Sequence, residues 1–110
     1  MIDLEKVSFK MPIDDCFEVD EFCPGVIVTG HIEIGTIKPN IAVKFVDSTG
    51  NMRFSSKVDE IIYQEGLVRL EKQMLESASA AQDDFWGIAL VFYDKEVLNI
   101  IENRMSVVIE

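Results

Sequence analysis

Two pairs of adjacent aspartates are the residues of this sequence with the clearest capacity for chemistry. Asp14-Asp15 and Asp83-Asp84 could act as paired carboxylates in acid–base catalysis, or as oxygen ligands of a hard cation. Neither pair has a second group of ligands close by in the sequence. We therefore favour solvated turn residues for both pairs, and we expect neither a metal nor another cofactor.

Histidine and cysteine give no catalytic or zinc-binding pattern. His31 is the single histidine, and no serine or cysteine stands near it at a motif spacing. Cys16 and Cys23 do not form a Cys-x-x-Cys pair, and one histidine is too little for a zinc site. We expect reduced thiols in a cytoplasmic protein, with a disulfide across a hairpin as the alternative. No hydrolase or transferase motif is present, so we expect a protein that is not an enzyme.

The charge of the chain bears on its partners. Its 110 residues include 20 acidic and 10 basic residues, for a formal net charge of −10. The basic residues are scattered, whereas nucleic-acid phosphates and anionic membranes favour clustered lysine and arginine. Broad nucleic-acid binding and membrane binding are therefore disfavoured, and solubility explains the acidity. The sequence does not indicate the oligomeric state.

The length fits one domain over residues 1–110, large enough to bury a core without disulfides or metals. No apolar run approaches the length of a transmembrane helix, and the first ten residues lack the pattern of a signal peptide. We expect a cytoplasmic location. Met1 suggests a complete gene product.

Most of the chain has the pattern of strands joined by turns. We expect strands at 7–19, 25–33, 41–47, 52–64, 85–93 and 105–109, a hairpin turn at 48–51, and a helical turn or loop at 97–101. Pro12 lacks an amide donor, so it indicates a sheet edge or a bulge. Segment 67–82 fits either a helix or a strand, and we favour a short helix. These short strands predict an all-β antiparallel barrel or sandwich, and closure into a barrel would remove exposed edges.

Two blocks of residues carry a resemblance to a known family. The run FKMPIDDCF at 9–17 resembles the opening of domain 2 of elongation factor Tu, where Met-Pro-Ile, two acids, a small residue and Phe occur in this order. The run VIVTGHIEIGTIK at 26–38 is similar to that family's valine-rich strand, Thr-Gly and following hairpin. Weaker likeness continues through FWGIAL at 85–90 to MSVV at 105–108.

The resemblance implies a closed six-stranded antiparallel β-barrel. The sequence also departs from the family. Asn40 replaces a turn glycine, which asparagine's tolerance of a left-handed conformation permits. The family glycine before the closing strand is absent near Asn103-Arg104. The chain has no G-x-x-x-x-G-K-[ST] motif to hold phosphates, so we expect a free-standing domain 2 without the GTPase domain.

In the family, domain 2 helps to hold the aminoacylated 3′ end of tRNA. Carried over by position, the candidate ligand-binding residues are Asp14, Asp15, Phe17, Ile27 and Ala89. An acidic edge beside an aromatic ring could bind an amine or a nucleoside. We favour a structural role for these residues, because Ile62 stands in place of a family glutamate that contacts the terminal adenosine and because the chain is acidic.

An aromatic-rich stretch supplies a second kind of candidate. Phe85, Trp86, Phe92 and Tyr93 belong to one expected strand, where core packing is the simplest role. If alternation turns some of these rings outward, they would mark a protein interface.

Our functional prediction is therefore a non-enzymatic binding module that contacts a protein partner, with translation as its setting. Binding of the aminoacyl 3′ end of tRNA is the alternative.

Overall fold

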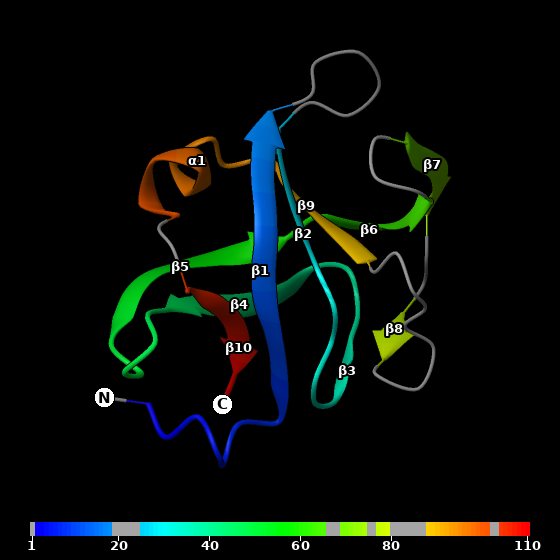
Figure 1. The fold of residues 1–110 in the computed structure, drawn as a ribbon. Helices are drawn as coiled ribbons and strands as arrows, with labels where there is room; N and C mark the ends of the chain where they lie inside the picture. Colours follow the sequence, from blue (N-terminus) through cyan, green and yellow to red (C-terminus); the bar gives the residue numbers. More distant parts are fainter. Residues whose placement is uncertain (1, 19–24, 66–68, 75–76, 80–87, 102–103) are drawn as a thin grey trace.

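The computed structural model describes residues 2–18, 25–65, 69–74, 77–79, 88–101 and 104–110. Eight strands form one antiparallel sheet in the order β5-β4-β10-β1-β2-β9-β6-β7, and β3 pairs with β8 (Figure 1). The elements are β1 (Phe9–Glu18), β2 (Val26–Gly30), β3 (Thr36–Ile37), β4 (Ile41–Val46), β5 (Met52–Val58), β6 (Glu60–Glu65), β7 (Arg69–Met74), β8 (Ala78–Ser79), β9 (Ile88–Phe92), the helix α1 (Glu96–Ile100) and β10 (Ser106–Ile109).

Strand β1 joins the two halves of this sheet. Its first residues, 9–12, pair with β10, whereas Ile13 and the residues after it pair with β2. Ile13 is opposite Gly30, but Asp15 is opposite Thr29, so Asp14 is an extra residue that forms a β-bulge. The bulge predicted from Pro12 therefore lies two residues further along. The long strand that crosses Figure 1 consequently holds β4, β5 and β10 to β2, β9, β6 and β7.

The main core lies on the inner face of the curled sheet. Phe9, Phe45 and Phe92 are fully buried in it, and the ring centroids of Phe45 and Phe92 lie 5.1 Å apart. Strands β2 and β9 are buried on both faces, because alternate residues contact a second, smaller cluster. This double burial explains why VIV at 26–28 and IALVF at 88–92 are continuous apolar runs rather than alternating ones.

The all-β class is confirmed, but the six-stranded closed arrangement is not what the described strands form. The stretch expected as one strand at 52–64 divides at Asp59 into β5 and β6, and the Asp59 amide donates to the Val91 carbonyl. Within the described residues, β5 and β7 each pair on one side, and no ladder joins them.

The helix expected within 67–82 is wrong for the described part of that segment. Residues 69–74 form β7, which pairs with β6 through Gln64↔Leu70 and Glu65↔Arg69. Residues 78–79 form β8, which pairs with β3. Helix propensity is worth only tenths of a kcal/mol per residue, so pairing with neighbouring strands overrides it. The expected turn at 97–101 is confirmed as α1.

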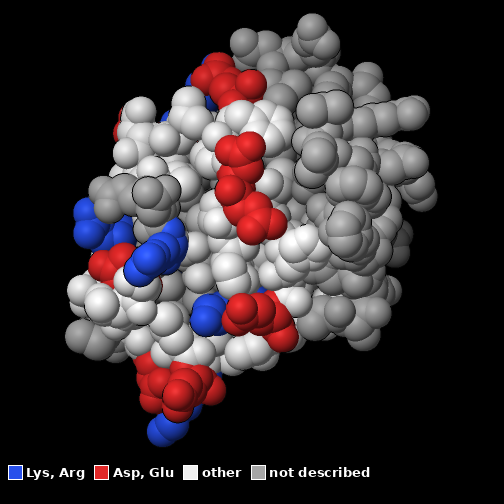
Figure 2. Space-filling model, viewed as in Figure 1, with Lys and Arg blue, Asp and Glu red and all other residues white. Residues whose placement is uncertain are grey.

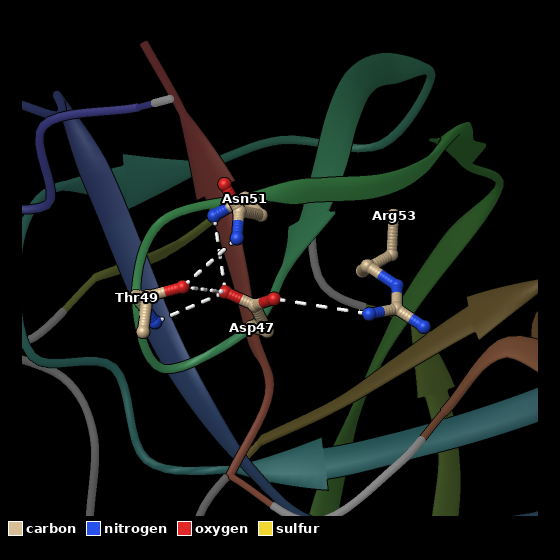
Figure 3. Close-up of polar contacts among 4 residues, drawn as sticks. All are labelled: Asp47, Thr49, Asn51 and Arg53. Carbon is tan, nitrogen blue, oxygen red and sulfur yellow. Dashed lines mark hydrogen bonds and ion pairs between the residues drawn. The ribbon is translucent and has the colours of Figure 1, made fainter.

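The turns use residues that tolerate a left-handed backbone. Gly35 has φ 84° and Asn40 has φ 65°, so asparagine does replace the family glycine at that turn. The predicted hairpin at 48–51 is organised by Asp47 (Figure 3). One Asp47 carboxylate oxygen accepts hydrogen bonds from the amides of Thr49 and Asn51, each at 3.0 Å, and from the Thr49 hydroxyl at 2.7 Å. These bonds, led by that from the Thr49 hydroxyl, lower the pKa of Asp47.

Gly30 provides a test of how closely β1 and β2 approach. A Cβ on Gly30 would lie 2.1 Å from the Pro12 carbonyl oxygen, a backbone atom that cannot turn aside. We expect Gly30→Ala to lower the free energy of unfolding by about 2 kcal/mol, measured by urea denaturation. Ser55→Ala, at an exposed position of β5, should change it by less than about 0.5 kcal/mol. Equal effects of the two substitutions would contradict the close approach.

Candidate functional site

A cavity of about 260 Å³ lies between the bulge of β1, helix α1 and the residues that lead into β10. We call it the β1–α1 cavity. A backbone hydrogen bond from the Ile13 amide to the Met105 carbonyl, 3.0 Å long, fastens two of its walls together. Among the described residues, its lining combines acidic, basic, thiol and aliphatic side chains, namely those of Ile13, Asp14, Asp15, Cys16, Leu98, Ile101 and Arg104.

Charges of both signs line this cavity. Asp14, Asp15 and Arg104 are all exposed. One Asp15 carboxylate oxygen accepts a hydrogen bond of 2.8 Å from the Cys16 amide. No ion pair between described residues involves Asp14, Asp15 or Arg104. Both aspartates and the guanidinium therefore face solvent at the same cavity, with their charges uncompensated by described side chains.

Arg104 is held in an unusual backbone conformation. Its φ is 66°, in the left-handed region where glycine is favoured over residues with a Cβ. This residue stands where the sequence lacks the family's glycine, directly before the buried Met105 and β10. The backbone accepts the strain and retains a guanidinium at this place.

The thiol of Cys16 forms a neutral part of the wall. Burial, followed by the charge of Asp15, raises its pKa to about 11. A thiol with this pKa is protonated at neutral pH and is a poor nucleophile. Cys16 is a free thiol in the structure, and Cys23 lies outside the described residues.

The five candidate ligand-binding residues divide between two places. Asp14 and Asp15 line the β1–α1 cavity, whereas Phe17, Ile27 and Ala89 gather in the second, smaller cluster. Ile27 and Ala89 are fully buried there, and Phe17 is half-buried against them. Ile62 is in the same cluster and is 2% exposed. The structure thus groups the apolar candidates and separates them from the acidic ones.

Alternation along the end of β9 separates two of the four aromatic candidates. Phe92 is fully buried, packed against Phe45, so it does not lie at the surface. Tyr93 is 50% exposed directly after the strand. Phe85 and Trp86 lie outside the described residues, as do Asp83 and Asp84.

Sequence reasoning missed the far wall of the cavity, made by Leu98, Ile101 and Arg104. These residues are more than 80 positions from the Asp14 bulge, and no motif links the two segments. The only sequence signal for this wall was the absence of the family glycine near Arg104. That signal concerns the backbone conformation there, and it does not indicate a charged side chain in a cavity.

The described surface is acidic where β1 crosses it. Figure 2 shows acidic side chains along the middle of this face. Asp14, Asp15 and Glu18 of β1 are exposed, and Glu18 pairs with Lys95 at 3.2 Å. Among the residues described, no group of three or more potential metal ligands comes together. None of the described helices is long and apolar enough to cross a membrane.

Comparison with known proteins supports the fold. No family model matches the chain. Over 49 residues, 44% of this chain, it is 47% identical to the large ribosomal subunit assembly factor BipA of Buchnera aphidicola subsp. Schizaphis graminum (strain Sg). The structure is similar to apo translation elongation factor SelB from Methanococcus maripaludis, with TM-score 0.61, 23% identity and 96% of this chain covered. It is also similar to a bacterial selenocysteine-specific elongation factor, EF-Sec, with TM-score 0.60, 18% identity and 98% covered.

These findings define the class of the fold, which is the β-barrel domain of translation factors. The resemblance to domain 2 of elongation factor Tu, drawn from two blocks of residues, is confirmed. The chain spans 8% of the length of BipA, 19% of SelB and 16% of EF-Sec.

The pKa of Cys16 gives a prediction about the cavity wall. In a Cys23→Ser background, alkylation of Cys16 by iodoacetamide at pH 8 should be at least about tenfold slower than that of a free thiol, with the rate still rising toward pH 11. Asp15→Asn removes the second cause of the shift and should lower the pKa, whereas Glu33→Gln should leave it unchanged. A rate that levels off near pH 8.5, about the pKa of a free thiol, would contradict the cavity geometry.

Proposed function

We propose that this domain is a non-enzymatic binding module that contacts a protein component of the translation apparatus. The observation that carries the proposal is the likeness of nearly the whole chain, 96% and 98% of it, to one domain of two translation elongation factors. The match to BipA, a large ribosomal subunit assembly factor, points to ribosomal particles as the setting. A cytoplasmic location accords with that setting.

The chemistry of the cavity supports binding rather than catalysis. Its thiol is protonated at neutral pH because its pKa is about 11. Its aspartates, Asp14 and Asp15, are exposed to solvent. The same residues are well suited to hold a polar group of a partner by charge.

The segment between β9 and β10 carries the proposed contact surface. Tyr93 and Leu98 are 50% and 37% exposed, on either side of the start of α1. Tyrosine supplies a rigid apolar ring with a polar end, and exposed large apolar side chains mark protein contacts when they gather. We include Phe85 and Trp86 in this proposal from the sequence alone.

Binding of the aminoacyl 3′ end of tRNA is the second candidate. The grouping of Phe17, Ile27 and Ala89 in one cluster favours it. The full burial of Ile27 and Ala89 and the net charge of −10 weigh against it, since a ligand would have to displace packed side chains and its phosphates would meet an acidic surface. We therefore rank it below protein binding.

Co-sedimentation with purified ribosomal particles through a sucrose cushion tests the proposed function. We expect the wild-type domain to pellet with a particle in a saturable way, and the double variant Tyr93→Ala/Leu98→Ala to bind roughly tenfold more weakly, since two exposed apolar contacts are lost. Met52→Ala is the matched control, because Met52 is 53% exposed but lies on β5. The proposal fails if no particle binds the domain, or if the control weakens binding as much as the double variant.

A further inference from the structure

We propose that the β1–α1 cavity receives a carboxyl-terminal lysine or arginine of a protein partner. The side-chain cation would lie at Asp14 and Asp15, and the terminal carboxylate at the guanidinium of Arg104. This inference rests on the proposed function, because it names the part of the partner that the module holds.

The charges of the lining are the first argument. Among the described residues, two carboxylates and one guanidinium line this cavity, and no ion pair within that part of the chain satisfies any of them. A ligand with a cation alone would leave Arg104 unpaired, and one with an anion alone would be repelled by two aspartates. A group that carries both charges complements all three side chains.

The size of the cavity is the second argument. Its volume is about 260 Å³. Sites for drug-sized ligands begin at roughly 300 Å³, so the volume of this cavity accords with a small ligand such as a single amino-acid residue. A carboxyl-terminal lysine or arginine places both charges within one residue, which a lysine inside a chain does not.

The aliphatic walls are the third argument. Leu98 is 37% exposed at the cavity, and Ile13 and Ile101 are half-buried beside it. Lysine and arginine bury their methylene stems against such surfaces while their charged ends reach polar groups. The neutral thiol of Cys16 adds no charge of its own to this surface.

The backbone holds the charged groups apart on two fixed supports. The bulge at Asp14 turns the aspartate pair, and the bond from the Ile13 amide to the Met105 carbonyl ties that bulge to the residue after Arg104. The backbone position of Arg104 is fixed by the residues that follow it, because Met105 is only 2% exposed and β10 begins at Ser106. A site on fixed supports loses less entropy when a ligand binds.

Titration of the isotope-labelled full chain with three small probes, followed by amide NMR, tests the proposal. Nα-acetyl-lysine carries both charges, Nα-acetyl-lysine amide lacks the carboxylate, and Nα-acetyl-norleucine lacks the cation. We expect saturable shifts at Asp14, Asp15, Leu98 and Arg104 with the first probe, and roughly tenfold weaker binding of the other two, the loss expected for one charged hydrogen bond.

Matched variants test which side chains bind the cation and which bind the carboxylate of the probe. Asp14→Asn/Asp15→Asn should weaken Nα-acetyl-lysine roughly tenfold or more, and Arg104→Gln should remove the preference over the amide probe. Asp3→Asn/Glu5→Gln makes the same change in net charge elsewhere and should leave binding unchanged. An unaltered amide spectrum outside the cavity shows that each variant is folded.

Several results would overturn the proposal. They are the absence of saturable shifts, equal binding of the three probes, shifts confined to other residues, or tighter binding of an aminoacyl-adenosine in this cavity. If Nα-acetyl-lysine fails while ribosomal particles still bind, the cavity proposal alone is lost. If the probe binds but no particle does, the site stands and the proposed function is lost.

Discussion

The sheet depends on one strand, β1, which pairs with two different neighbouring strands along its length. Strand β1 pairs with β10 over its first four residues and with β2 from Ile13 onward, so it joins the two halves of the sheet where it changes partner. At that point the Pro12 carbonyl comes so near Gly30 that no side chain fits between them. The absence of a Cβ at Gly30 is therefore a condition for the curled sheet, rather than a general aid to chain reversal.

The candidate site is a consequence of this change of partner. The extra residue at Asp14 lies where β1 changes partner, and Asp14 and Asp15 line the cavity there. The approach to β10 must return to β1 at the same place, which brings Arg104 to the cavity. Geometry that builds the sheet thus also gathers opposite charges on its surface, and recognition of a doubly charged residue is the use we assign to them.

The sequence predicts the apolar strands well because double burial leaves continuous runs such as those of β2 and β9. It also predicts the turn at Asn40, whose residue type reports its backbone angle. It fails for residues 69–74, where helix formers lie in β7, because pairing with β6 is a long-range property. It finds half of the cavity for the same reason: Asp14 and Asp15 belong to a recognisable block, whereas Arg104 reaches them only through the fold.

Amide hydrogen exchange measured residue by residue tests most directly whether β1 unites the two halves. We predict that the slowest amides of β4 and β10 exchange with the same free energy as those of β2 and β9, because loss of β1 releases both halves together. Two groups of amides, one in each half, whose exchange free energies differ by more than about 2 kcal/mol would contradict this account.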